Sequence, residues 1–231
     1  MTSWQVLVAH AVKVLVLVTL AGILTRRRAG LCWSFVAYLA VVLTANSLVS
    51  FWPERFFAGW FWMLQAALYD ALKMAIAAEL AYRTFKAFPA AQATARRVLF
   101  LALLGTSLAA VGVPKDSSYP AAFVELEPRI LTGTIWLMTG LALLIVWYRV
   151  PVNAFHKAIL LGFVPYLLVF TSLLRLLEHY GWEILPVVQS AEPVAYMLMV
   201  GWWAAAAWQP DSVAQVSPAL LRRLHASRAR S

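Results

Sequence analysis

Cysteine and charged residues are both scarce in this sequence. The chain has 231 residues with a single cysteine, Cys32, and only 13% of its residues are charged. One cysteine excludes an intramolecular disulfide and a cluster of thiolate metal ligands. Ordinary soluble domains contain about 25% charged and about 45–50% apolar residues, whereas 63% of this chain is apolar. Because the apolar residues come in long runs, the sequence predicts a membrane protein.

Room for a folded domain outside the membrane is also lacking. Each membrane span needs about 20 residues, so seven spans would use roughly 140. The remainder suffices for connections and tails, which excludes a kinase, nucleotide-binding or nucleic-acid-binding module on this chain. The net charge of +9 does not indicate a nucleic-acid partner, because the basic residues flank apolar runs. That distribution is typical of anchoring at anionic lipid.

Seven apolar segments predict an all-α fold, a polytopic bundle of seven transmembrane helices. The spans are expected at 5–24, 31–52, 58–82, 98–113, 129–148, 158–178 and 193–208. No basic segment precedes the first span and three arginines follow it, so it is a retained span and not a cleavable signal peptide. Residues 1–208 are thus expected to form the bundle, and 209–231 a basic cytoplasmic tail.

The basic residues predict the orientation, since Lys and Arg mark the cytoplasmic ends of spans. They gather after the first, third and fifth spans and in the tail, at Arg26, Arg27, Arg28, Arg83, Lys86, Arg96, Arg97, Arg149, Lys157, Arg222, Arg223, Arg228 and Arg230. The other side has three basic residues, Arg55, Lys115 and Arg129, together with the acids Glu54, Asp116, Glu125, Glu127, Glu178, Glu183 and Glu192. The N-terminus is therefore expected outside and the C-terminus in the cytoplasm, which also requires the short fourth segment to cross.

Two outer connections and the tail complete this map. The connections at 113–128 and 179–192 are the candidates to cap the outer mouth of the bundle. In the tail, Ser217 and Pro218 form a good helix start, followed by an apolar strip among arginines. This short helix is expected to lie on the inner leaflet against anionic lipids; the alternative is docking to a partner protein.

Two pairs of polar residues lie deep within predicted spans. Asp70 and Lys73 are three positions apart, so they share one helix face, which Gln65 and Tyr69 extend. His10 and Lys13 have the same spacing in the first span. Because charges in a bilayer often mark function, these six residues are candidates for a ligand-binding site. The alternative, which we favour, is a neutralised ion pair or hydrogen-bonded core network.

Pairing each acid within the predicted spans with a basic residue leaves one lysine without an acid. Two lysines, Lys13 and Lys73, face a single mid-depth acid, Asp70, because Glu79 is better placed to pair with Arg83 four residues on. The extra lysine could be neutral, extend outward or hold an anionic ligand group. We predict that Lys13 has no protein carboxylate of its own and faces the bundle core.

Other titratable residues give weaker indications. Arg175, Glu178 and His179 at the outer end of the sixth span are either an anion site or, more commonly, an interfacial salt-bridge cluster. His156 and His225 are expected to be solvated on the inner side. The histidine spacings fit neither a metal site nor a haem, and the last span lacks a lysine for retinal. No cofactor is therefore expected.

The stretch from Glu79 to Pro89, ELAYRTFKAFP, resembles the end of the third span in uncharacterised bacterial seven-helix proteins. Some signalling proteins carry a similar membrane region as a sensor module. The resemblance implies a receptor-like or scaffold role in the bacterial inner membrane. An output domain is missing here, so signalling would need a protein partner, bound through the tail or loops.

These observations predict a non-enzymatic sensory or interaction protein, or a subunit of a larger membrane assembly. The alternative is a small transporter or membrane enzyme that uses Asp70 and Lys73, with His10 and Lys13 in support. A continuous polar cavity from Asp70 and Lys73 to either surface would favour ligand sensing or catalysis. A dry, closed core would favour the interaction protein.

Overall fold

The computed structural model describes residues 3–85, 97, 119–147 and 152–210. Its elements are α1 (Ser3–Thr25), η1 (Ala29–Leu31), α2 (Trp33–Phe51), α3 (Pro53–Phe56), α4 (Gly59–Phe85), α6 (Tyr119–Trp147), α7 (Ala154–Tyr180), η2 (Gly181–Ile184) and α8 (Leu185–Trp208). No strand occurs in these ranges, so the all-α class is confirmed for them. The predicted span at 98–113 and the tail helix lie outside the described residues.

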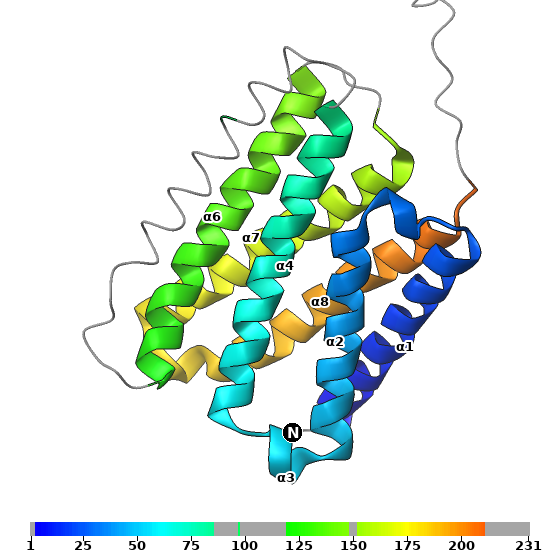
Figure 1. Ribbon diagram of the computed structural model, residues 1–231. Helices are drawn as coiled ribbons and strands as arrows, with labels where there is room; N and C mark the ends of the chain where they lie inside the picture. The colour runs from blue at the N-terminus through cyan, green and yellow to red at the C-terminus, as the bar shows by residue number, and fades with distance from the viewer. Residues whose placement is uncertain (1–2, 86–96, 98–118, 148–151, 211–231) are drawn as a thin grey trace, which may run out of the picture.

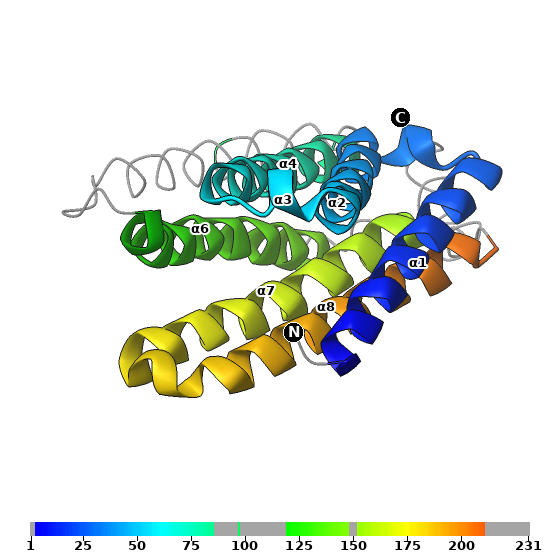
Figure 2. The same ribbon diagram turned by 90° about the horizontal axis from the view of Figure 1, so that it is seen from below.

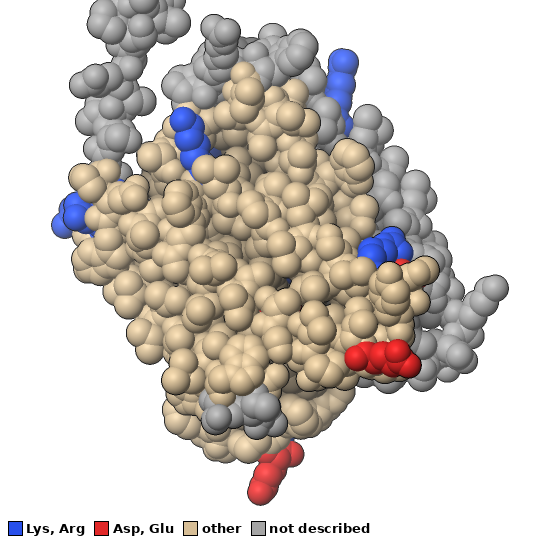
Figure 3. Space-filling view, turned by 180° about the vertical axis from the view of Figure 1, so that it is seen from behind, with Lys and Arg blue, Asp and Glu red and all other residues tan. Residues whose placement is uncertain are grey.

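Three stretches of described helix are long and apolar enough to cross a membrane. They are Trp4–Thr25, Trp33–Phe51 and Ala154–Trp208, the last of which contains α7 and α8. Large apolar side chains on the bundle surface stay exposed, among them Leu7 at 69%, Val146 at 73% and Leu198 at 67%. Figure 3 shows one face with almost no charge away from its margins. Since soluble monomers rarely expose such patches, the chain is an integral membrane protein.

The six long described helices form a closed ring of neighbours. Helix α2 packs on α4, α4 on α6, α6 on α7, α7 on α8, α8 on α1, and α1 on α2. Figures 1 and 2 show α2 and α4 on one side of the bundle, and α1, α7 and α8 on the other. The ends of α1, α4 and α8 meet the starts of α2 and α7 at one end of the bundle, here named the Arg28 end.

An aromatic core joins α2, α7 and α8. Trp203 is fully buried, with its ring centroid 4.9 Å from that of Phe35 and 4.6 Å from that of Phe163. Tyr38 lies edge-on to Phe163 at 5.4 Å. Gly162 makes this packing possible, because a Cβ there would collide with the Trp203 indole. The core is therefore set by one small residue facing one large one.

Helix ends follow the local sequence. Helix α7 begins where the Asn153 side chain accepts a hydrogen bond from the Phe155 N–H at 2.8 Å. It ends before Gly181, whose φ of +71° is a conformation that favours glycine. Pro165 lies inside α7, as predicted.

Two helices begin inside segments predicted to be connections. Helix α8 begins at Leu185 and includes Pro193, so only Gly181–Ile184 separates it from α7, not the predicted 179–192. Pro186 at the start of α8 needs no hydrogen-bond partner there, which allows the helix to begin earlier. Helix α6 likewise begins at Tyr119, inside the predicted connection 113–128. The prolines and acids that indicated loops are accommodated within helices.

Candidate functional site

Asp70 and Lys73 form a buried ion pair on α4. Lys73 Nζ lies 2.8 Å from Asp70 Oδ1, and the two residues are only 6% and 5% exposed. Their spacing of three residues places them on one helix face, as predicted. The two charges neutralise each other within a single helix, so the pair alone does not call for an external ligand.

Gln65 and Tyr69 extend this face and meet the core tyrosines. Gln65 Nε2 donates to the Tyr69 hydroxyl at 2.9 Å. The Tyr69 ring lies edge-on to Tyr38 of α2 at 5.7 Å, and the Tyr38 hydroxyl is 3.5 Å from that of Tyr196 on α8. The predicted α4 residues thus belong to a contact that spans three helices.

Glu192 is a member of this cluster that sequence analysis assigned to the outer connection. It lies on α8, where the Tyr166 hydroxyl of α7 donates to its Oε1 at 3.0 Å. It is also within electrostatic range of Lys73. The spacing of four between Glu192 and Tyr196 places both on one helix face, a signal that becomes readable once α8 is extended to Leu185. The full set, named the central polar cluster, is Tyr38, Gln65, Tyr69, Asp70, Lys73, Tyr166, Glu192 and Tyr196.

His10 and Lys13 lie apart from the central polar cluster. His10 is exposed, and its Nδ1 donates to the Val6 carbonyl at 2.8 Å on its own helix. Lys13 is half-buried and donates to Ser50 Oγ of α2. Among the described residues, no hydrogen bond or ion pair joins these two residues to Asp70 or Lys73. The two polar stripes therefore do not bond to one another within the described residues.

Lys13 extends away from the Arg28 end. At about 1.5 Å per residue, Lys13 lies about 18 Å along α1 from Thr25, whereas Ser50 lies about 25 Å along α2 from Trp33. The side chain bridges this difference by reaching toward the opposite end of the bundle. Of the three possibilities for the extra lysine, a side chain that extends outward fits this contact, because Ser50 lies one residue before the end of α2.

Arg175 and Glu178 form an exposed ion pair on α7. The Nη1–Oε2 distance is 2.7 Å, and the side chains are 57% and 53% exposed. His179 packs its ring against Tyr180. An exposed pair of this kind contributes about 0–1 kcal/mol. The geometry matches the interfacial salt bridge that sequence analysis considered the commoner case.

Glu79 pairs with Arg83, as predicted, and also caps α2. The Arg83 Nη2–Glu79 Oε1 distance is 2.6 Å. Glu79 further accepts hydrogen bonds from the Ser34 N–H at 2.8 Å, the Ser34 hydroxyl at 2.6 Å and the Trp33 N–H at 3.1 Å. The first N–H groups of a helix lack partners within the helix. A carboxylate from α4 supplies those partners across the bundle, which the sequence spacing could not reveal.

Arg28 caps the C-terminal end of α8, as Glu79 caps the N-terminal end of α2. It is 4% exposed and donates from Nη1 to the carbonyls of Ala206 and Ala207 at 2.9 and 3.1 Å, and from Nη2 to that of Gln209. Arg26 donates to the carbonyl of Trp208 at 3.3 Å. A cation at a helix C-terminus is favourable both as a donor and against the helix dipole. Sequence analysis assigned Arg26, Arg27 and Arg28 to lipid anchoring, and two of them, Arg26 and Arg28, instead bond to backbone carbonyls of the protein.

His156 is buried, contrary to the prediction that it is solvated. It is 7% exposed, and its Nε2 donates to the Leu31 carbonyl at 2.9 Å. The α1–α2 connection folds over the start of α7, and its carbonyl at Leu31 takes the imidazole as a donor. His225 lies outside the described residues.

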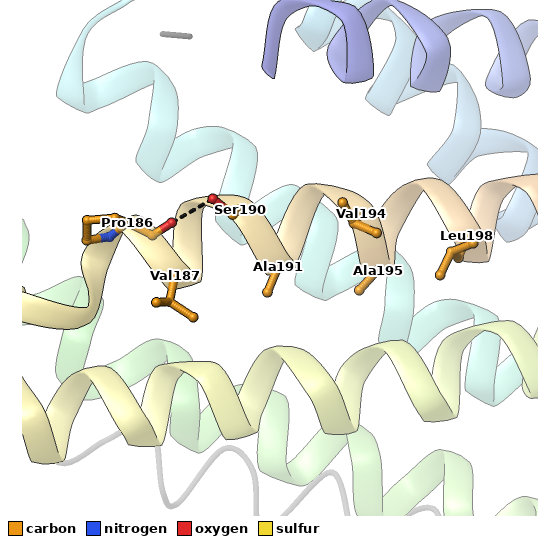
Figure 4. Close-up of a pocket in the computed structure, with 7 residues that line it drawn as sticks. All are labelled: Pro186, Val187, Ser190, Ala191, Val194, Ala195 and Leu198. Atoms are coloured by element: carbon orange, nitrogen blue, oxygen red, sulfur yellow. Dashed lines mark hydrogen bonds between the residues drawn. The ribbon is translucent and has the colours of Figure 1, made fainter. Parts of the chain in front are cut away.

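Two open grooves lie along α8 and α7. The larger, about 630 Å³, is bordered by residues from the first half of α8 (Figure 4): Pro186, Val187, Ser190, Ala191, Val194, Ala195 and Leu198. The smaller, about 250 Å³, lies between α7 and α8 and includes Pro165, Tyr166 and Trp202 in its wall. Both walls are mostly apolar, and neither includes Asp70 or Lys73. Within the described residues, no group of three His, Cys, Asp or Glu side chains is arranged to hold a metal.

Comparisons of the chain with protein-family models, curated proteins and solved structures give no significant match.

Proposed function

We propose that this chain is a non-enzymatic, seven-span membrane protein that acts as a sensory module or as a subunit of a larger membrane assembly. Its N-terminus lies outside and its C-terminus in the cytoplasm of a bacterial inner membrane. Figure 1 shows α1, α4, α6 and α8 running toward the Arg28 end and α2 and α7 running away from it, directions that are compatible with this map. The grouping of Arg26, Arg27, Arg83 and Lys157 on elements that meet at the Arg28 end also supports it. The fourth span belongs to the proposal on sequence grounds.

The single observation that carries the non-enzymatic role is the closed setting of Asp70 and Lys73. Both are almost fully buried and bond to each other at 2.8 Å. A catalytic or transport site needs a pocket where titratable groups meet a substrate. The described grooves are apolar and bordered by other residues. The pair is therefore better suited to a structural role than to chemistry.

Comparing single and double variants tests this role. Removing one partner of a buried pair leaves an uncompensated charge, whereas replacing both with apolar or neutral residues is often tolerated. We expect Asp70→Asn to lower the yield and melting temperature of the purified protein, and Asp70→Asn with Lys73→Met to restore both. If the double variant folds normally yet fails to complement a deletion of the gene while the wild type does, the pair has a chemical role and the transporter or enzyme alternative is favoured.

The orientation is tested by single-cysteine labelling in whole cells. In a background with Cys32→Ser, we introduce Glu183→Cys in η2 or Arg27→Cys at the Arg28 end, both exposed positions. A membrane-impermeant maleimide should label Glu183→Cys in intact cells and Arg27→Cys only after permeabilisation. Equal labelling of both in intact cells would contradict the proposed map.

The exposed basic residues of the Arg28 end indicate which partners the protein binds. Arg26 and Arg27 are exposed there, where each basic residue near an anionic leaflet adds about 1 kcal/mol of attraction. We propose that anionic lipids bind this rim, and that a signalling partner binds the tail or loops. The resemblance of residues 79–89 to bacterial seven-helix proteins with sensor-like membrane regions is the basis for the sensory version of the proposal.

A further inference from the structure

The central polar cluster contains one more carboxylate than it has cations. Lys73 Nζ is 2.8 Å from Asp70 and forms its ion pair there. Glu192 accepts a hydrogen bond from the neutral Tyr166 hydroxyl, and no ion pair to Glu192 occurs within the described residues. Its interaction with Lys73 acts over a longer range. With all three groups ionised, the cluster carries a net charge of −1.

Among the described residues, the neighbouring groups do not supply the missing positive charge. Tyr166 of α7 donates to Glu192, and its ring contacts that of Tyr196 on α8. Tyr196 in turn meets Tyr38 of α2, which contacts Tyr69 of α4, and all four tyrosines are neutral donors and acceptors. Lys13, the lysine of α1, bonds to Ser50 on α2. An unbalanced charge within a bilayer is costly. Within the part of the chain that the structure describes, the cluster therefore lacks a cation that balances Glu192.

We propose that the Glu192 carboxyl, together with the Tyr166 hydroxyl, binds one monovalent cation, either a proton or a sodium ion. Tyr166 also lies in the wall of the smaller groove between α7 and α8, which offers a path to the site. The bound cation balances the charge of the cluster that links α4, α7 and α8. This inference concerns binding alone and is independent of the proposed sensory role.

The occupant determines which solution condition changes the stability of the bundle. A proton would make the packing of α7 and α8 depend on pH, and sodium would make it depend on salt. On unfolding, Glu192 meets water and releases the cation. The folded state should therefore be more stable at low pH if the occupant is a proton, and at high sodium if it is the metal.

The test uses the purified full chain in lipid nanodiscs, comparing wild type, Glu192→Gln and the matched control Glu183→Gln in the exposed η2 turn. For a proton, the wild type shows the infrared carbonyl band of a protonated carboxylic acid at neutral pH. Glu183→Gln keeps this band and Glu192→Gln loses it. For sodium, replacing potassium chloride by sodium chloride at fixed pH raises the melting temperature of the wild type and of Glu183→Gln but not of Glu192→Gln.

Either pattern supports the site and identifies its occupant. A wild type that shows neither the band nor the sodium effect overturns the proposal, and so does a Glu192→Gln variant that retains the wild-type response. Tyr166→Phe gives a second test should Glu192→Gln fail to fold. Removal of the hydroxyl donor should shift the carbonyl band or weaken the sodium effect, and an unchanged response would count against the site.

Discussion

The Glu79 carboxylate of α4 accepts hydrogen bonds from both the backbone N–H and the hydroxyl of Ser34, at 2.8 and 2.6 Å, so that one helix caps another. The same carboxylate pairs with Arg83 on its own helix. A residue that sequence spacing assigns to one local salt bridge therefore holds α2 and α4 together at the Arg28 end.

Replacing Glu79 should measure the strength of this cap. Glu79→Ala removes acceptors from Ser34 and Trp33, and we expect the free energy of unfolding to fall by about 2 kcal/mol. Glu178→Ala removes an exposed pair on α7 and should change it by less than about 1 kcal/mol. Chemical unfolding in detergent, followed by tryptophan fluorescence, compares the two. Equal losses would mean that the cap adds nothing beyond a surface salt bridge.

Variants of Arg28 and Arg27 should distinguish an effect on stability from an effect on lipid binding. Arg28→Met deprives the end of α8 of its buried donor and should lower the free energy of unfolding by about 1.5–3 kcal/mol. Arg27→Met alters an exposed side chain and should stay within about 0.5 kcal/mol. Each variant loses one positive charge, but only Arg28→Met also loses a buried contact. We therefore expect Arg27→Met to weaken binding to anionic vesicles without a loss of stability. A destabilised Arg27→Met would contradict this division.

Gly162 should tolerate no side chain. Gly162→Ala places a methyl group against the Trp203 indole, and we expect a loss of about 1–3 kcal/mol from overpacking. Gly30→Ala is the control, because nothing lies within 4 Å of a Cβ at that position. The double variant Gly162→Ala with Trp203→Phe, which shortens the facing ring, should recover part of the loss in melting temperature. No recovery would place the strain elsewhere.

Cys32 should be unreactive in the folded protein. It precedes α2 and is 1% exposed, and burial, with the nearby Glu79 carboxylate adding to the effect, raises the pKa of its thiol from 9.0 to about 11. A rise of this size lowers the thiolate fraction at neutral pH roughly a hundredfold. Maleimide labelling should therefore be slow until denaturant is added, whereas Glu183→Cys, studied with Cys32→Ser, should react quickly. Rapid labelling of Cys32 in the folded protein would show that the Arg28 end opens.

The sequence predicts several helices well because their boundaries coincide with changes in polarity. Long apolar runs place α1, α2, α4 and α7 within a few residues of their observed bounds. The starts of α6 and α8 are missed, because Pro193 and the acids before it are typical of loops yet lie in the interior of a helix. Seven spans and their orientation stay predictions.

The candidate site is predictable only where its residues share a helix. Asp70, Lys73, Gln65 and Tyr69 are found by spacing along α4, and Glu79 with Arg83 likewise. Glu192 is missed because its partner Tyr166 lies on another helix, and pairing between helices depends on rotation and tilt, which periodicity leaves open. His156 is missed for the same reason, since its acceptor is a backbone carbonyl 125 residues away.

The guanidinium of Arg28 binds the carbonyl of Ala206, which is synthesised 178 residues later. While the ribosome is still producing the middle of the protein, the first hairpin enters the bilayer with a buried donor that has none of its α8 partners. Synthesis of α8 therefore completes the contacts of Arg28, and polypeptides truncated before α8 should be recognised by membrane quality-control proteases as unfinished.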